Sequence, residues 1–138
     1  MEVDDYLKDS YDEFESKTNI MTCSEIYEND IIITPVKDRD MSRSMMSQIA
    51  DDLLQIQDVE AAFVIANDGN GQTCISARSN GKMNVQRIME KMHGGGHMTA
   101  AAMQREQCDI DEVKNELLTY LKEYLEEEEA VNESNSEE

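Results

Sequence analysis

Tryptophan is absent from this sequence of 138 residues, and aromatic residues make up only 5% of it. The core therefore has to be built from aliphatic side chains and from ten methionines. No apolar run approaches the roughly 18 residues of a membrane span. The acidic opening Met1–Asp5 lacks the basic and then apolar pattern of a secretion signal. We expect a single small domain that is soluble and faces the cytoplasm.

Cysteine is scarce as well. Cys23, Cys74 and Cys108 are odd in number, and no two of them form a C-x-x-C pair. This argues against a disulfide framework and favours a reducing compartment.

Positive charge is low overall but unevenly distributed. Acidic residues outnumber basic ones by 31 to 12, which gives a net charge of −19. Long nucleic acid is a disfavoured partner, because its binding requires many phosphates to be neutralised. Residues 73–108, however, carry five basic side chains and two acidic ones. A local basic region on an acidic body suits a small anion better than a polymer.

The first half of the domain alternates strands and helices. The β-branched run 31–36 predicts a strand, and Asp40 is placed to cap a helix that extends to Ile56. The apolar run 60–66 predicts a strand covered on both faces, followed by a hairpin turn and a strand at 73–78. The helix should bury Met45, Met46, Ile49, Leu53 and Ile56.

The second half begins with a helix that Asn84 caps and that Gly94 should end in a left-handed conformation. A short strand of small residues follows at 101–105. Asp109 and Glu112 form a capping-box-like start to the last helix. The apolar faces of these two helices comprise Val85, Ile88, Met89 and Met92 in the first, and Ile110, Val113, Leu117, Leu121 and Tyr124 in the second.

The order of these elements predicts an α/β fold, a small mixed β-sheet with flanking helices in a single domain. Residues 20–125 form this domain. Residues 1–19 are expected to be a helical extension or a linker from a preceding domain, with its helix over 1–17. Residues 126–138, rich in Glu, Ser and Asn, are expected to be a disordered acidic tail.

The glycine run Gly94-Gly95-Gly96, followed by His97, is the best candidate for a functional element. Glycine is the costliest residue to order, so three in a row persist where a Cβ would obstruct the backbone or a ligand. Successive N–H groups free of side chains can form an anion-binding concavity. The run lacks the Gly-Lys-Ser/Thr ending of a Walker-type loop, which disfavours an NTPase.

Polar residues near this run could complete a nucleotide site. His97 could donate a hydrogen bond to an anion or act as an acid–base group. Arg78 ends a strand immediately before Ser79, and its guanidinium could hold phosphate through two hydrogen bonds. Asn84 and Gln86 carry amides of the kind that read base edges, although a helix cap and an exposed polar residue are alternative roles.

A complete catalytic or metal-binding set is not recognisable. His93 lies four residues before His97, but the glycines between them break the helix that would align the pair, and no third ligand has suitable spacing. No nucleophile, base and acid occur together. We expect a binding domain without a cofactor of its own.

The residues Ile75–Ser79, Asn84–Gln86, Gly94–His97 and Thr99 resemble the DHH-associated C-terminal domain of DHH-family phosphoesterases. Within that superfamily the chain looks most like the GdpP-type cyclic di-AMP phosphodiesterases of Gram-positive bacteria. Gln104, seven residues after the histidine, favours this branch over the RecJ-like nucleases, while Ala102 replaces the usual last glycine of the motif.

The resemblance implies an enzyme in two parts. A DHH domain holds Mn²⁺ ions and activates water, and the associated domain holds cyclic di-AMP or pApA across the cleft. This chain has no Asp-His-His motif, so the resemblance implies a fragment that cannot hydrolyse the substrate alone, from a parent anchored in the membrane by an N-terminal region. The resemblance implies that Gly94, Gly95, Gly96, His97 and Arg78 contact phosphate and base, with Asn84 and Gln86 as helpers. Ser79 and Thr99 are expected to bind the substrate as well.

Other functions stay open at this stage. They are a stand-alone nucleotide sensor, a RecJ-like or short-RNA phosphoesterase module, and a structural or dimerising domain in which the glycines only turn the chain. A DHH-encoding stretch upstream in the same reading frame would favour the enzyme, whereas tight single-strand binding with a steep salt dependence would favour the nuclease. A homodimer is a further open alternative.

Overall fold

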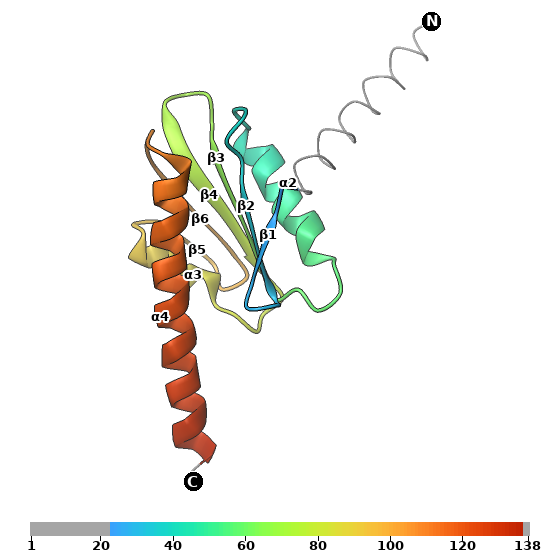
Figure 1. The fold of residues 1–138 in the computed structure, drawn as a ribbon, viewed down its shortest axis with the longest axis vertical. Helices are drawn as coiled ribbons and strands as arrows, with labels where there is room; N and C mark the ends of the chain where they lie inside the picture. The colour runs from blue at the N-terminus through green and yellow to red at the C-terminus, as the bar shows by residue number, and fades with distance from the viewer. Residues whose placement is uncertain (1–22, 137–138) are drawn as a thin grey trace, which may run out of the picture.

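The computed structural model describes residues 23–136 and has a mixed β-sheet with helices on both faces (Figure 1). Within these residues the sheet has six strands in the order β1-β2-β3-β4-β6-β5. β2 and β3 are parallel, and the other neighbouring strands are antiparallel. The predicted α/β class is confirmed. The elements are β1 (Glu25–Tyr27), β2 (Ile31–Pro35), α2 (Arg43–Leu54), β3 (Ala61–Asn67), β4 (Gln72–Ser79), α3 (Val85–Lys91), β5 (Gly95–Gly96), β6 (Ala100–Glu106) and α4 (Ile110–Ser136).

The predicted extension over residues 1–19, with its helix at 1–17, lies outside the described residues. Between residues 23 and 136, no helix is both long enough and apolar enough to cross a bilayer.

Two hydrophobic cores lie on opposite faces of the sheet. α2 packs Met46, Ile49 and Leu53 against β2, β3 and the first part of β4. α3 and α4 cover the other face, where Phe63 is fully buried. β3 is buried on both faces, as its unbroken apolar sequence predicts. On the α2 face the sheet opens to solvent beyond β4, and Ala102 on β6 is exposed there.

α2 begins and ends inside its predicted bounds. Ser42, not Asp40, is the N-cap, and its hydroxyl accepts from the N–H of Met45 at 3.1 Å. Serine is as good a cap as aspartate, and the periodic apolar pattern does not locate the start to within two residues. The helix ends at Leu54, so Ile56 is 47% exposed and does not join the inner face.

The end of α3 differs from the prediction. His93, not Gly94, takes the left-handed conformation, with φ +66°. The N–H of His93 donates to the carbonyl of Glu90 at 3.1 Å, and the N–H of Gly94 donates to the carbonyl of Met89 at 2.8 Å. These are the two bonds of a Schellman motif, so the helix ends one residue earlier than a Gly94 cap would end it.

Two short strands were not predicted. β1 precedes β2 and pairs with it, and Lys114 of α4 holds Glu25 of β1 through an ion pair of 2.9 Å. β5 contains only two glycines, which have a low β propensity. With three and two residues, neither strand is long enough to show the alternating pattern on which a sequence-based prediction depends.

α4 is the longest helix, and it projects past the sheet in Figure 1. All five residues predicted for its buried face are buried, and Asp109 accepts from the N–H of Asp111 at 2.8 Å, as a capping residue does. A disordered tail was predicted from Glu126, but the helix continues through Ser136. Glu127 supports this continuation, because it pairs with Arg87 of α3 at 3.2 Å.

Candidate functional site

The glycine run forms the edge strand of the sheet. Gly95 and Gly96 pair with Ala102 and Ala101 of β6. A Cβ on Gly94 would collide with the carbonyl oxygen of Ala102. Gly96 combines a φ of +141° with a Cβ position 2.6 Å from the Cα of Ala101. The close approach of β5 to β6 therefore requires both of these glycines.

Gly95 differs from its two neighbours. A Cβ built on it meets no atom of the described residues within 4 Å, apart from its own chain neighbours. It is paired directly with Ala102, and residues paired in this way share a face of the sheet. Neither packing nor a left-handed backbone accounts for this glycine. It is thus the member of the run that a ligand can approach.

Small side chains continue from Gly95 across the sheet. Ser76, Ala102 and Gly95 lie in one row over β4, β6 and β5 on the α2 face of the sheet, and the row runs from Ser76, which α2 covers, to Ala102, which is exposed. We call this row the small-residue shelf. Ser76 is only 4% exposed, and its hydroxyl lies 3.4 Å from that of Ser47 on α2. A flat ligand can rest on the open part of this row, at Ala102 and Gly95, without displacing a side chain.

Arg78 lies at one end of the shelf. It follows Ser76 by two residues on the same face of β4 and is paired with Ala100 of β6. Its Nε donates to Oδ1 of Asp51 at 3.1 Å, and its Nη1 donates to the carbonyl of Ala77 at 2.8 Å. These bonds fix the guanidinium against the strand. A guanidinium has five N–H donors, so others are left for an anion.

The turn that joins β5 to β6 lies beside Arg78. The N–H of His97 donates to the carbonyl of Ala100 at 2.7 Å, which closes the turn. The carbonyl of Thr99 accepts from the N–H of Ser79 at 2.9 Å, so the turn is attached to the end of β4. The side chains of His97 and Thr99 are exposed. The structure thus brings His97, Thr99 and Arg78 to the same end of the sheet.

A pocket of about 400 Å³ is lined by Ser76 and Ala102 of the shelf and extends along β4 and β6 on the side away from Arg78. Its volume falls in the range of about 300–1,000 Å³ that small-molecule sites occupy. Gly94 is the only one of the nine predicted site residues among its described lining. The side chains and backbone that line it belong to Arg43, Ser47, Cys74, Ile75, Ser76, His93, Gly94, Ala102, Met103 and Gln104.

Ser79 has a structural role. Only 4% of it is exposed, and its hydroxyl donates to the carbonyl of Met83 at 2.7 Å while accepting from the N–H of Gly81 at 3.3 Å. A ligand could reach this hydroxyl only if the loop after β4 opened. Gln86, in the first turn of α3, is half-buried.

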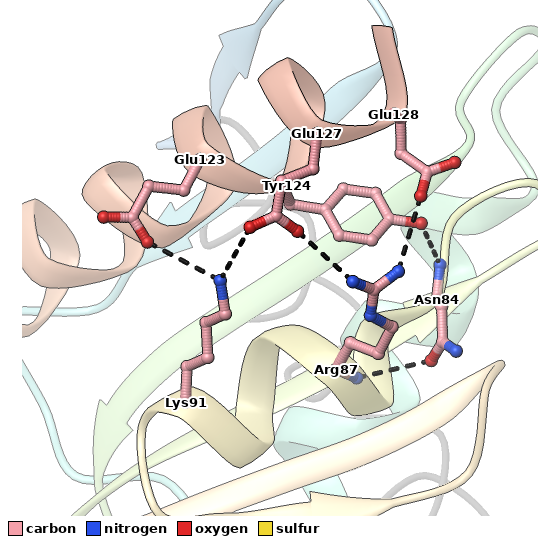
Figure 2. A network of polar contacts seen from close by, with 7 residues as sticks. All are labelled: Asn84, Arg87, Lys91, Glu123, Tyr124, Glu127 and Glu128. Carbon is pink, nitrogen blue, oxygen red and sulfur yellow. Dashed lines mark hydrogen bonds and ion pairs between the residues drawn. The ribbon is translucent and has the colours of Figure 1, made fainter. Parts of the chain in front are cut away.

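Asn84 caps α3 and joins it to α4 (Figure 2). Its side-chain oxygen accepts from the N–H of Arg87 at 3.3 Å, and its own N–H donates to the hydroxyl of Tyr124 at 2.9 Å. The guanidinium of Arg87 lies 5.6 Å from the centre of the Tyr124 ring. Lys91 pairs with Glu123 at 3.6 Å and with Glu127 at 3.5 Å. This network holds the helix from which the glycine run emerges.

Comparison with known proteins identifies the family of this chain. The DHHA1 domain model matches residues 28–127. The chain belongs to the DHHA1 family. The predicted resemblance to the DHH-associated domain is thereby confirmed.

Curated relatives of this DHHA1 domain include two cyclic-di-AMP phosphodiesterases. The chain is 34% identical over 127 residues to GdpP of Bacillus subtilis, covering 90% of this chain and 19% of that protein. It is 35% identical over 123 residues to PdeA of Listeria monocytogenes, covering 88% and 19%. A membrane protein–ribosomal subunit bL9 fusion of Aster yellows witches'-broom phytoplasma is 37% identical over 88% of this chain and 14% of its own length. The chain thus spans about a fifth or less of each relative.

Solved structures confirm the fold. A pGpG-specific phosphodiesterase, PggH, from Vibrio cholerae matches with a TM-score of 0.58 at 16% identity, over 81% of this chain and 39% of that one. An exopolyphosphatase-related protein from Bacteroides fragilis matches with a TM-score of 0.60 at 15% identity, over 86% of this chain and 35% of that one.

The residues described in this DHHA1 domain do not fit a metal ion. Between residues 23 and 136, no group of three or more His, Cys, Asp or Glu side chains lies close enough to hold one.

Several residues of the site were missed or left unassigned by the sequence analysis. Arg43, Ser47 and Asp51 lie on α2 at spacings of four, which places them on one side of the helix along β4. That spacing was visible in the sequence, but the side of the helix that faces a ligand was not. Cys74 belongs to the pocket floor, and burial raises the pKa of its thiol, which favours the neutral form.

Proposed function

We propose that this DHHA1 domain holds the substrate of a DHH-family phosphodiesterase that hydrolyses cyclic di-AMP to pApA. The Mn²⁺ ions and the attacking water belong to a separate DHH domain of the parent protein. Two curated relatives that match about nine-tenths of this chain are named cyclic-di-AMP phosphodiesterases, which supports this choice of substrate. The chain's own part is to bind and orient the nucleotide.

The observation that carries the proposal is the position of Arg78 and Gly95 on one face of the sheet. Arg78 supplies a guanidinium whose planar donors match a phosphate, and it is held against β4 by its bond to the carbonyl of Ala77. Gly95 leaves space for a ligand beside the shelf of Ser76 and Ala102. A phosphate at Arg78 with its sugar or base on the shelf uses all of these features.

The charge distribution supports a small anionic ligand. The chain carries a net charge of −19, so a nucleotide is repelled by most of the surface and attracted only where basic groups gather. Arg78 and Arg43 both lie along the side of α2 that borders the shelf, each beside one carboxylate, Asp51 at 3.1 Å and Asp68 at 3.9 Å. This arrangement favours a ligand with few phosphates over a long nucleic acid.

The test is a titration of the isotope-labelled chain, followed by NMR, with cyclic di-AMP and pApA and with AMP as a comparison. We expect saturable shifts centred on Arg78, Gly95 and His97. Arg78→Ala should abolish them, whereas Arg39→Ala, which removes an exposed arginine from the loop before α2, should not.

If millimolar cyclic di-AMP and pApA shift none of these residues, the isolated domain does not recognise the nucleotide. The titration is then repeated with the DHH domain of a relative added. Binding that still fails to involve the shelf overturns the proposal. A second assay measures Mn²⁺-dependent release of pApA by the purified chain. Release would contradict the assignment of the chemistry to a separate domain.

A further inference from the structure

α3 lies behind the hairpin that β5 and β6 form, on the face of the sheet opposite the shelf. We call this pair of strands the glycine hairpin. Ile88 and Met89 of α3 are buried in the same core as Ala101 of β6, whereas the next residue, Ala102, belongs to the shelf on the other face. A helix of seven residues is too short to be stable by itself, so its position depends on its neighbours.

Both ends of α3 are joined to the glycine hairpin. At the start of the helix, the N–H of Val85 donates to the carbonyl of Met98, in the turn between β5 and β6, at 3.0 Å. At its end, the N–H of Gly94 donates to the carbonyl of Met89 at 2.8 Å, and the chain continues directly into Gly95. Because both connections are direct, a movement of α3 along the sheet moves the turn and the glycine run with it.

A second side of α3 is held by α4 (Figure 2). The guanidinium of Arg87 lies over the Tyr124 ring, 5.6 Å from its centre. Its Nη2 lies 3.2 Å from a carboxylate oxygen of Glu127, and its Nη1 lies 3.5 Å from one of Glu128. Lys91, one turn further along α3, also pairs with Glu127, at 3.5 Å. The contacts with α4 therefore centre on Arg87.

The part of α4 that makes these contacts depends on them in turn. Glu123 and Glu127 are four residues apart, and Glu126 and Glu129 are three apart, spacings at which like charges destabilise a helix. Between residues 125 and 131, no side chain of α4 is fully buried. This part of the helix is held to the domain by its ion pairs with α3, so the same contact orders both helices.

We propose that Arg87 is a positioning residue for the ligand site. Through α3, its contacts with α4 determine the position of the glycine hairpin, and this position decides how closely a nucleotide fits against Gly95. The inference rests on the proposed function and adds a control of affinity to it. Because Ile88 and Met89 keep α3 in the core, loss of the half-exposed Arg87 guanidinium should change binding more than stability.

Glu127→Gln combined with Glu128→Gln is the most informative variant, because positioning and simple charge repulsion predict opposite results. The double substitution keeps the size of both side chains and removes the ion pairs of Arg87. If Arg87 positions the glycine hairpin, affinity for cyclic di-AMP should fall about two- to fivefold. If the two glutamates only repel an anionic ligand, affinity should rise, and this result would overturn the proposal.

Glu126→Gln combined with Glu129→Gln is the matched control. It removes the same charge from the same part of α4, but neither glutamate forms an ion pair with the residues that the structure describes. Its affinity for cyclic di-AMP should stay the same or rise slightly. The melting temperatures of both double variants should lie within about 5 °C of the unsubstituted chain, because exposed ion pairs contribute about 1 kcal/mol or less.

Arg87→Gln tests the same contact from α3. Alone it should weaken cyclic di-AMP binding about as much as the Glu127/Glu128 double variant does, whereas Arg87→Lys, which keeps the charge, should lose less. Adding Arg87→Gln to that double variant should cause little further loss, because residues that act through one contact are not additive. Fully additive losses would mean that Arg87 acts on the ligand by long-range charge alone, which contradicts a positioning role.

NMR spectra without ligand separate this inference from the proposed function. The Glu127/Glu128 double variant should shift the amide signals of Gly95 and Met98 and speed hydrogen exchange at Val85, whose N–H is bonded to the turn. The control variant should leave them unchanged. Unmoved signals at Gly95 and Met98 overturn the positioning role, whatever the affinity. If the unsubstituted chain binds no cyclic di-AMP, the proposed function fails, and the control of affinity by Arg87 fails with it.

Discussion

Nε of Arg78 lies 3.1 Å from Oδ1 of Asp51, so α2 places a carboxylate on the guanidinium that we assign to phosphate. The two side chains differ in exposure, 21% for Arg78 and 59% for Asp51. The carboxylate is therefore the partner that can move into solvent, while the guanidinium stays against the strand. A phosphate that binds here has to displace Asp51 or share the arginine with it.

Asp51→Asn should strengthen binding of cyclic di-AMP, because the competing negative charge is removed. An exposed ion pair contributes about 1 kcal/mol or less, so we expect an increase in affinity of up to about fivefold and little change in stability. Calorimetric titration measures it, with Asp52→Asn as the neighbouring control. Weaker binding in Asp51→Asn would mean that the carboxylate positions the arginine instead of competing for it.

Replacement of single glycines should separate packing from ligand access. Gly94→Ala introduces a collision with the β6 backbone and should destabilise the fold by about 2 kcal/mol or more. Gly95→Ala meets open space, so its stability to urea should change by less than about 0.5 kcal/mol while cyclic di-AMP affinity falls. If Gly95→Ala binds cyclic di-AMP as tightly as the unsubstituted chain does, the glycine run has no role in binding the ligand.

Tyr124→Phe should loosen the start of α3. The Tyr124 hydroxyl accepts from the N–H of Asn84 at 2.9 Å, and the tyrosine is only 6% exposed. Loss of the hydroxyl leaves this donor without its partner and should cost about 1–2 kcal/mol of unfolding free energy. Urea denaturation measures the cost. Tyr120→Phe is the control, since Tyr120 is half-buried on the same helix, and an equal loss there would argue against the Asn84 bond as the cause.

Stability should fall in acid partly through Glu116. Its hydrogen bond to the Arg105 guanidinium, of which the shorter arm is 2.6 Å, lowers the pKa of the carboxyl group from its ordinary value of 4.5. A lowered folded-state pKa stabilises the protein above the unfolded pKa, and this stabilisation is lost as pH falls through the folded value. The Glu116→Gln variant should therefore be less stable than the unsubstituted chain near neutral pH. This difference in unfolding free energy should disappear below about pH 4.

Urea midpoints at several pH values test this prediction. Glu112 is an exposed carboxylate in the first turn of α4, and Glu112→Gln serves as the control. Its urea midpoint should stay close to that of the unsubstituted chain at every pH. If the stability difference between Glu116→Gln and the unsubstituted chain stays constant down to about pH 3, packing is responsible for it and the ion pair with Arg105 is not.

Local pattern was enough to predict much of the fold. The continuous apolar run of β3, the capping role of Asn84 and the buried face of α4 are all confirmed, because each depends on residues close in sequence. The Asp40 cap and the left-handed Gly94 were wrong because a suitable residue stood nearby in each case. Ser42 and His93 took these roles, and the choice between neighbours depends on where the helix meets the sheet.

The nine residues predicted for the site do not share one role in the structure. Arg78 and Gly95 share one face of the sheet and the turn at His97 lies at the same end as Arg78, whereas Ser79 is enclosed beneath its loop and Asn84 caps a helix. A motif lists residues by position in the chain and does not say which of them support the backbone. That distinction required the distances from a Cβ on each glycine to its neighbours.

The sequence by itself determined the class of the fold, the helix and strand periods, the family and the importance of the glycine run, since these are properties of residue type and order. Only the tertiary structure decided that Gly95 is the open glycine, that Asp51 covers Arg78 and that a pocket lies between Arg43 and His93. These relations join α2 to β4 and β6, which are distant in the chain. The register of the sheet and the length of α2 set them, and no local pattern encodes either.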